Sequence, residues 1–154
     1  MELDFLFAAN EDYEALRALE NAKVFTNTIG VLAEQCCEKY LKHLILLEKR
    51  DSDKGGFLIP LPKDELHNLT KLSSYLYSHC DFKTPYPMRK DLFNLTRLYQ
   101  CIRYPNYHYH KITMAEVTTS INTAINCRAM VLKRVKEIEN EKINQAEMDT
   151  DIER

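Results

Sequence analysis

The residues best suited to chemistry in this chain lie in one short stretch, Arg103-Tyr104-Pro105-Asn106-Tyr107-His108-Tyr109-His110. Arginine keeps its charge and can grip a phosphate with two N–H groups, whereas histidine exchanges a proton near neutral pH. These two side-chain types are sufficient for phosphodiester cleavage without a metal, with the RNA 2′-hydroxyl as the nucleophile. We therefore take Arg103, His108 and His110 as candidate catalytic residues, and we predict neither a metal site nor a cofactor.

Further residues are candidates for binding a nucleotide or RNA. Tyr104, Asn106 and Tyr109 lie in the same stretch, and Lys39 with Lys42 would form a phosphate-facing pair on an earlier helix. Simpler roles stay open for each of them. The tyrosines can be packing groups, the lysines a solvated helix face, the histidines exposed loop residues, and Arg103 a cation that caps the end of its helix.

The elements that would position these residues are helices, because apolar residues recur every three or four positions. Pro105 disfavours helical geometry at Tyr104, so the helix before the stretch should end there. Thr113 with Glu116 forms the capping-box pattern that begins a last helix. The predicted helices cover about Asp4–Glu20, Thr28–Lys49, Lys63–Ser78, Met88–Ile102 and a stretch from Thr113 to about Asn140.

Composition supports a single all-α domain. The chain has 154 residues, 45% of them hydrophobic, and only 3 Gly and 5 Pro to interrupt helices. We predict an antiparallel bundle of about five helices over residues 1–140, followed by an acidic, frayed tail over 141–154. The net charge of −2 gives no global sign of nucleic-acid binding, so an RNA-binding role needs a local basic patch.

The five cysteines indicate the redox state of the cell compartment in which the protein is found. Their number is odd and their spacing does not match a zinc site, which favours free thiols in a reducing cytosol. The first residues lack the basic region of a signal peptide, and no apolar run reaches the roughly 20 residues needed to span a bilayer. We expect a cytoplasmic protein without a membrane partner.

Four pieces of the chain together resemble the HEPN family, small all-α domains named for nucleotide binding. Ala9-Asn10-Glu11-Asp12-Tyr13 resembles its first helix, and the segment Gln35 to Lys42 resembles its Gln-x-x-Glu-Lys-x-x-Lys signature. His67-Asn68-Leu69 is close to its His-Asp-Leu, and Arg103-Tyr104-Pro105-Asn106 is close to its Arg-Tyr-Pro-Asp. The resemblance covers roughly Asp4 to Asn140.

The resemblance implies a function and partners. Many members are metal-independent endoribonucleases, often toxins paired with a nucleotidyltransferase antitoxin, and two copies usually meet as a homodimer. Their motif is Arg, four to six residues, then His, so Arg103 pairs equally well with His108 or His110. Active members usually carry Asn, Asp or His after the Arg, where this chain has Tyr104. The alternative is therefore a non-enzymatic nucleotide- or RNA-binding module, or an adaptor that partners a nucleotidyltransferase. A structural dimerisation domain also stays open, because helix bundles with exposed Tyr and Leu often associate.

Overall fold

The computed structural model describes residues 4–48, 67–105 and 109–152. These residues form five helices: α1 (Phe5–Asn21), α2 (Asn27–Glu48), α3 (Leu69–His79), α4 (Tyr86–Ile102) and α5 (Met114–Ile152). No strand occurs in the described part of the chain, and the predicted all-α bundle of about five helices is confirmed. Within the same residues, no helix combines the length and apolar character that a membrane crossing requires.

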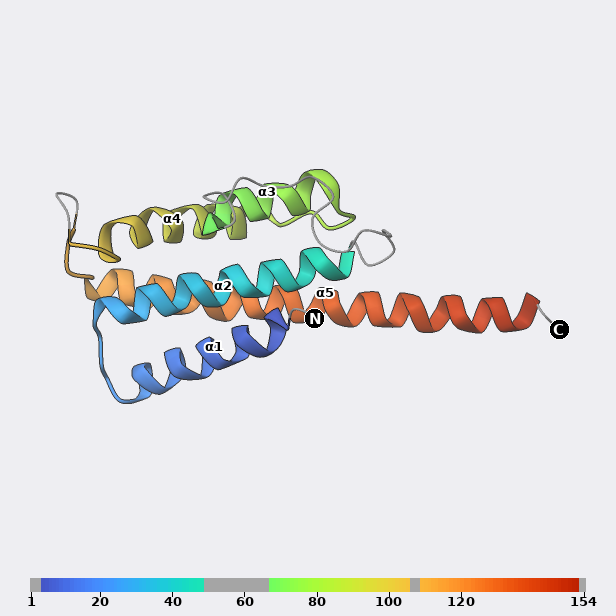
Figure 1. Cartoon of the computed structure of the whole chain (residues 1–154), viewed down its shortest axis with the longest axis horizontal. Helices are drawn as coiled ribbons and strands as arrows, with labels where there is room; N and C mark the ends of the chain where they lie inside the picture. The colour runs from blue at the N-terminus through green and yellow to red at the C-terminus, as the bar shows by residue number, and fades with distance from the viewer. Residues whose placement is uncertain (1–3, 49–66, 106–108, 153–154) are drawn as a thin grey trace.

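Helix α2 is the centre of the bundle, because it packs against each of the other four helices. Figure 1 shows α1 on one side of α2, α3 and α4 on the other, and α5 running alongside. Many apolar residues of α2 are fully buried, among them Ile29, Ala33, Cys36, Tyr40 and Leu44. A helix surrounded in this way must bury its polar residues too, and Glu34, Glu38 and Lys42 are all less than a tenth exposed.

Local capping groups set several helix boundaries. The Asp4 side chain accepts from the Phe7 N–H at 2.9 Å, and Asn68 accepts from the N–H groups of Thr70 and Lys71. The predicted capping box is confirmed, since Glu116 N–H donates to the Thr113 hydroxyl and Thr113 N–H donates to the Glu116 carboxylate. These bonds satisfy donors that the first turn of a helix leaves unpaired.

Two helix boundaries differ from the prediction. The third helix begins at Leu69 rather than near Lys63, because Asn68 caps it; residues 63–66 lie outside the described residues. Helix α5 continues to Ile152 rather than losing order after Asn140. Residues 141–152 contain no Gly or Pro, and Gln145 bonds Asp149 one turn on, which favours helix even with exposed side chains. The domain boundary at residue 140 stays a prediction.

Candidate functional site

A pocket of about 330 Å³ lies where α2 meets the C-terminal end of α4 and the residue that precedes the α3 cap. Its volume is at the lower end of the range of small-ligand sites. It joins segments that are far apart in the sequence: its lining residues are Gln35, Glu38, Lys39, His67, Tyr99, Arg103 and Tyr104. Three of the predicted site residues therefore share one pocket, namely Lys39, Arg103 and Tyr104.

Arg103 is the C-cap residue of α4, and its side chain lies among tyrosines. Its guanidinium carbon is 5.0 Å from the ring centre of Tyr99 and 4.4 Å from that of Tyr104, and Nη1 donates to the Tyr99 hydroxyl at 3.3 Å. Desolvation acts to lower the pKa of Arg103, but hydrogen bonds with Tyr104 and Tyr99 outweigh it and raise the pKa. Arg103 forms no ion pair with a carboxylate of the described residues, so its charge is available to an anion.

His67 and Glu38 form a hydrogen-bonded pair on the wall of the pocket. Nδ1 of His67 lies 2.8 Å from Oε1 of Glu38, while the His67 side chain is 62% exposed. The second oxygen of Glu38 lies 3.4 Å from Nζ of Lys42, and both of these side chains are about one-tenth exposed. Glu38 therefore orients a histidine that remains accessible to a ligand, as a carboxylate does in many acid–base sites.

The two lysines of α2 have different surroundings. Lys39 lines the pocket and pairs with Asp12 of α1 at 2.5 Å. Lys42 does not line it; its ammonium is held by Glu38 and lies 5.7 Å from the Phe5 ring centre. The phosphate-facing lysine pair is thus reduced to Lys39, because the central position of α2 turns Lys42 into the bundle.

Glu34, one helical turn before Glu38, is a buried carboxyl group near the pocket. It is 1% exposed, and its Oε1 has no hydrogen-bond partner among the described residues. Burial, followed by the negative charge of Glu38, raises its pKa to about 8, although Arg103, Lys42 and Lys39 act in the opposite direction. At neutral pH Glu34 is therefore mostly protonated, and it does not neutralise Arg103.

His110 lies outside this pocket. Its Nε2 is 3.2 Å from each Glu116 carboxylate oxygen, and its backbone N–H donates to the Cys101 carbonyl at 3.0 Å. Desolvation acts to raise the pKa of Glu116, but hydrogen bonds from Thr113 and the nearby His110 lower it. Tyr109 is exposed and does not line the pocket. His108 and Asn106 lie outside the described residues.

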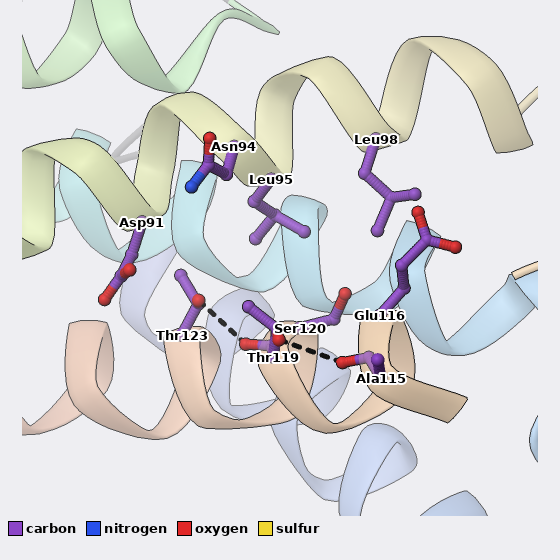
Figure 2. A pocket seen from close by; sticks show the side chains of 9 residues that line it. All are labelled: Asp91, Asn94, Leu95, Leu98, Ala115, Glu116, Thr119, Ser120 and Thr123. Carbon is purple, nitrogen blue, oxygen red and sulfur yellow. Dashed lines mark hydrogen bonds between the residues drawn. The ribbon is translucent and has the colours of Figure 1, made fainter. Parts of the chain in front are cut away.

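A second cavity, of about 200 Å³, lies between α4 and α5 (Figure 2). Leu95 and Leu98 of α4 face Thr119, Ser120 and Thr123 of α5 across it, and Asp91 and Glu116 contribute carboxylates. Carboxylates repel phosphate, so this cavity is unsuited to a nucleotide. Compared with this cavity, the pocket of Arg103 is the better candidate for an anion site.

The first pocket can hold a phosphate and can exchange a proton. Arg103 offers a fork of N–H donors, Lys39 adds a second cation that is paired with Asp12, and the accessible imidazole of His67 lies beside its carboxylate partner. The described residues contain no cluster of three or more His, Cys, Asp or Glu side chains with metal-binding geometry.

Reasoning from the residues alone did not select His67, Glu38, Gln35 or Tyr99 as site residues. The His67 side chain bonds to Glu38 of α2, 29 residues away in the sequence, a partner that the local sequence does not indicate. A signal was nevertheless present. Gln35, Glu38 and His67 belong to the short sequence pieces that resemble known motifs, and those pieces converge with Arg103 on one pocket.

Comparison with known proteins agrees with these pieces. The model of the HEPN domain family matches residues 3–138, which is most of the chain. No curated protein and no solved structure matches it. The family match, the five-helix bundle and the convergence of the motif pieces on one pocket lead to one conclusion: the chain belongs to the HEPN domain family.

Proposed function

We propose that this protein binds RNA at the pocket of Arg103 and cleaves it as a metal-independent endoribonuclease. One observation carries the proposal: a guanidinium without a carboxylate partner among the described residues shares a pocket with an accessible histidine that is hydrogen-bonded to a buried glutamate. Such a pocket combines a phosphate anchor with a proton-exchanging group.

In the proposed reaction the RNA 2′-hydroxyl attacks the adjacent phosphorus. A neutral histidine takes the hydroxyl proton, the P–O5′ bond breaks, and a proton passes to the leaving oxygen, which leaves a 2′,3′-cyclic phosphate and a 5′-hydroxyl. Arg103 would hold the phosphate and offset the charge that develops on its oxygens. The acid–base candidates are His108 and His110 from the motif spacing, with His67 added because it lines the pocket.

The same proposal covers the cell compartment of the protein and its partners. Cys36, Cys37, Cys101 and Cys127 are free thiols, which supports a reducing cytoplasm. One Arg and one or two His residues make a sparse site, so we propose a homodimer in which two copies bring their sites together. A nucleotidyltransferase antitoxin is the further partner that we propose, and co-purification with such a protein encoded next to this chain would test it.

The decisive experiment is incubation of the purified protein with a mixed RNA pool in EDTA. Wild type should produce fragments with 2′,3′-cyclic phosphate ends, whereas Arg103→Ala should produce none. Separate His67→Ala, His108→Ala and His110→Ala variants would identify the acid and the base. Cleavage by Arg103→Ala at the wild-type rate would refute the proposed site.

A second candidate function is nucleotide binding without turnover, in an adaptor module. Two observations favour it: Glu116 already engages His110, and Tyr104 lies over Arg103, where a polar residue is usual in active members. This hypothesis predicts that mononucleotides bind the wild type but not Arg103→Ala, and that the protein cleaves no RNA. Isothermal titration with AMP, ATP and GMP would distinguish the two readings.

A further inference from the structure

The outer face of α4 carries basic and aromatic side chains in alternation. Tyr86, Lys90, Phe93 and Arg97 follow one another at spacings of four, three and four residues, which aligns them on a single exposed stripe. Arg89 lies beside this stripe and reaches the neighbouring helix α3. We name this surface the basic–aromatic ridge and define it by Tyr77, Tyr86, Arg89, Lys90, Phe93 and Arg97.

Two of the three cations of the ridge, Arg89 and Arg97, are held against its rings. The guanidinium of Arg89 lies 5.1 Å from the ring centre of Tyr77 and 5.7 Å from that of Tyr86, and the guanidinium of Arg97 lies 5.8 Å from that of Phe93. These are cation–π distances. The rings still face solvent, with Tyr86 69% and Phe93 45% exposed. Each pair therefore presents a positive charge and an aromatic surface together.

Charge is unevenly distributed over the molecule. Residues 69–103 contain six basic and two acidic residues, a net charge of +4, although the whole chain carries −2. The only carboxylate of α4 belongs to Asp91, which lines the cavity against α5 on the opposite side of the helix (Figure 2). The ridge is therefore the local basic patch that a chain with this net charge needs in order to bind a polyanion.

The ridge leads to the pocket of Arg103. Continuing the same spacing beyond Arg97 reaches exposed Gln100 and then Tyr104, which lines that pocket. Because the helix rises 1.5 Å per residue, the distance along its axis from Tyr86 to Arg103 is about 25 Å. A flexible polyanion held on the ridge would thus enter the pocket at its end.

We propose that the basic–aromatic ridge binds single-stranded RNA and delivers it to the pocket, an inference that rests on the proposed function. Arginine and lysine would neutralise phosphates, while Tyr86 and Phe93 would stack on unpaired bases. A duplex hides its base faces, so the rings favour a single strand over a duplex. The aromatic component also distinguishes the ridge from a surface that attracts any polyanion.

Binding is measured by fluorescence anisotropy with a 2′-O-methyl RNA of about 12 nucleotides, a probe that lacks the nucleophile and cannot be cleaved. The ridge variant is Arg89→Ala/Lys90→Ala/Arg97→Ala. The matched control, Lys133→Ala/Lys136→Ala/Lys142→Ala, removes three exposed cations of α5. The ridge variant should bind at least about tenfold more weakly, with a salt dependence shallower by about two in log–log slope, and the control should bind within about twofold of wild type.

A separate variant, Tyr86→Leu/Phe93→Leu, should weaken single-strand binding with an unchanged salt slope. Equal losses of RNA affinity in the ridge and control variants would overturn the proposal. Equal affinity of the wild type for single-stranded and duplex RNA would also overturn it. So would ridge-dependent binding of anionic phosphatidylserine vesicles without binding of RNA. Arg103→Ala keeps the ridge intact. If the wild type binds RNA through the ridge but does not cleave it, the ridge proposal is upheld and the endoribonuclease proposal is refuted. If the wild type cleaves RNA and the ridge variant cleaves it equally well, the endoribonuclease proposal is upheld and the ridge proposal is refuted.

Discussion

The side-chain amide of Asn27, in the first turn of α2, donates a hydrogen bond to the backbone carbonyl of His110 at 3.0 Å. The same amide donates to the Ile102 carbonyl at 3.4 Å, and its oxygen accepts from the Ile112 N–H at 2.7 Å. One side chain therefore holds both ends of the segment between α4 and α5, the segment that begins with Arg103. Asn27 is a positioning residue for the candidate site.

Replacing Asn27 with Ala should leave the Ile112 N–H and the two carbonyls without their partner. We expect the free energy of unfolding to fall by about 1–3 kcal/mol and RNA cleavage to fall further than this loss of folded protein explains. Urea unfolding and cleavage assays below the transition measure the two effects. Asn94→Ala, at an exposed position of α4, is the control; an identical response of both variants would contradict the positioning role.

Gly30 allows α2 to approach the same segment closely. A Cβ at this position would lie 2.3 Å from Cδ1 of Ile102 and 3.2 Å from Cδ1 of Ile112. Gly30→Ala should therefore destabilise the protein by about 1–2 kcal/mol, despite the better helix propensity of Ala. Thermal unfolding of Gly30→Ala/Ile102→Val, which removes the obstructing methyl group, should recover part of the loss; no recovery would place the strain elsewhere.

The Glu38 carboxylate links Lys42 to His67. Glu38→Gln should leave the ammonium of Lys42 buried without its counter-ion, at a cost of about 1–3 kcal/mol in the free energy of unfolding. Adding Lys42→Met should restore much of that stability, because a buried charge is then replaced by an apolar side chain. If His67 acts through Glu38, the double variant stays impaired in cleavage even though its stability returns.

Glu34 gives stability a specific dependence on pH. In the unfolded chain its carboxyl ionises near its ordinary pKa, whereas in the folded protein the pKa is about 8. The stabilising contribution of protonated Glu34 is therefore fully present below the pKa of the unfolded chain and is lost as pH rises to about 8. Over this interval the free energy of unfolding falls by up to roughly 1.4 kcal/mol per pH unit.

The test of this dependence compares wild type with Glu34→Gln by urea unfolding at pH 5 and pH 8. Relative to the variant, wild type should lose at least about 2 kcal/mol over this interval. Glu139→Gln, at an exposed position of α5, should follow wild type. A constant difference between wild type and Glu34→Gln would mean that Glu34 is ionised in the folded protein.

Arg103 should not be replaceable by lysine. Lysine keeps the charge but loses the planar fork that spans a phosphate and stacks between Tyr99 and Tyr104. We expect cleavage to fall at least about 100-fold, while the free energy of unfolding changes by less than about 0.5 kcal/mol because Arg103 is exposed. Lys133→Arg, on α5, is the control for a basic exchange, and full activity of Arg103→Lys would mean that charge alone is needed.

The sequence by itself determined the local features of this protein. The apolar period predicts α1, α2 and α4 to within about two residues of their bounds, and the Thr113–Glu116 capping box marks the start of α5. The chemistry of the side chains in the stretch 103–110 selected Arg103, which does line a pocket. These features depend on side chains within one or two helical turns, so a sequence pattern reports them directly.

Only the tertiary structure decided which residues surround Arg103. Glu38 and Lys42 fit a solvated helix face by periodicity, but α2 packs against four helices, and both side chains are less than a tenth exposed. The Glu38–His67 and Asn27–His110 bonds join residues 29 and 83 positions apart. Such pairs form because packing brings distant helices together, and the spacing of residues within one helix carries no information about that packing.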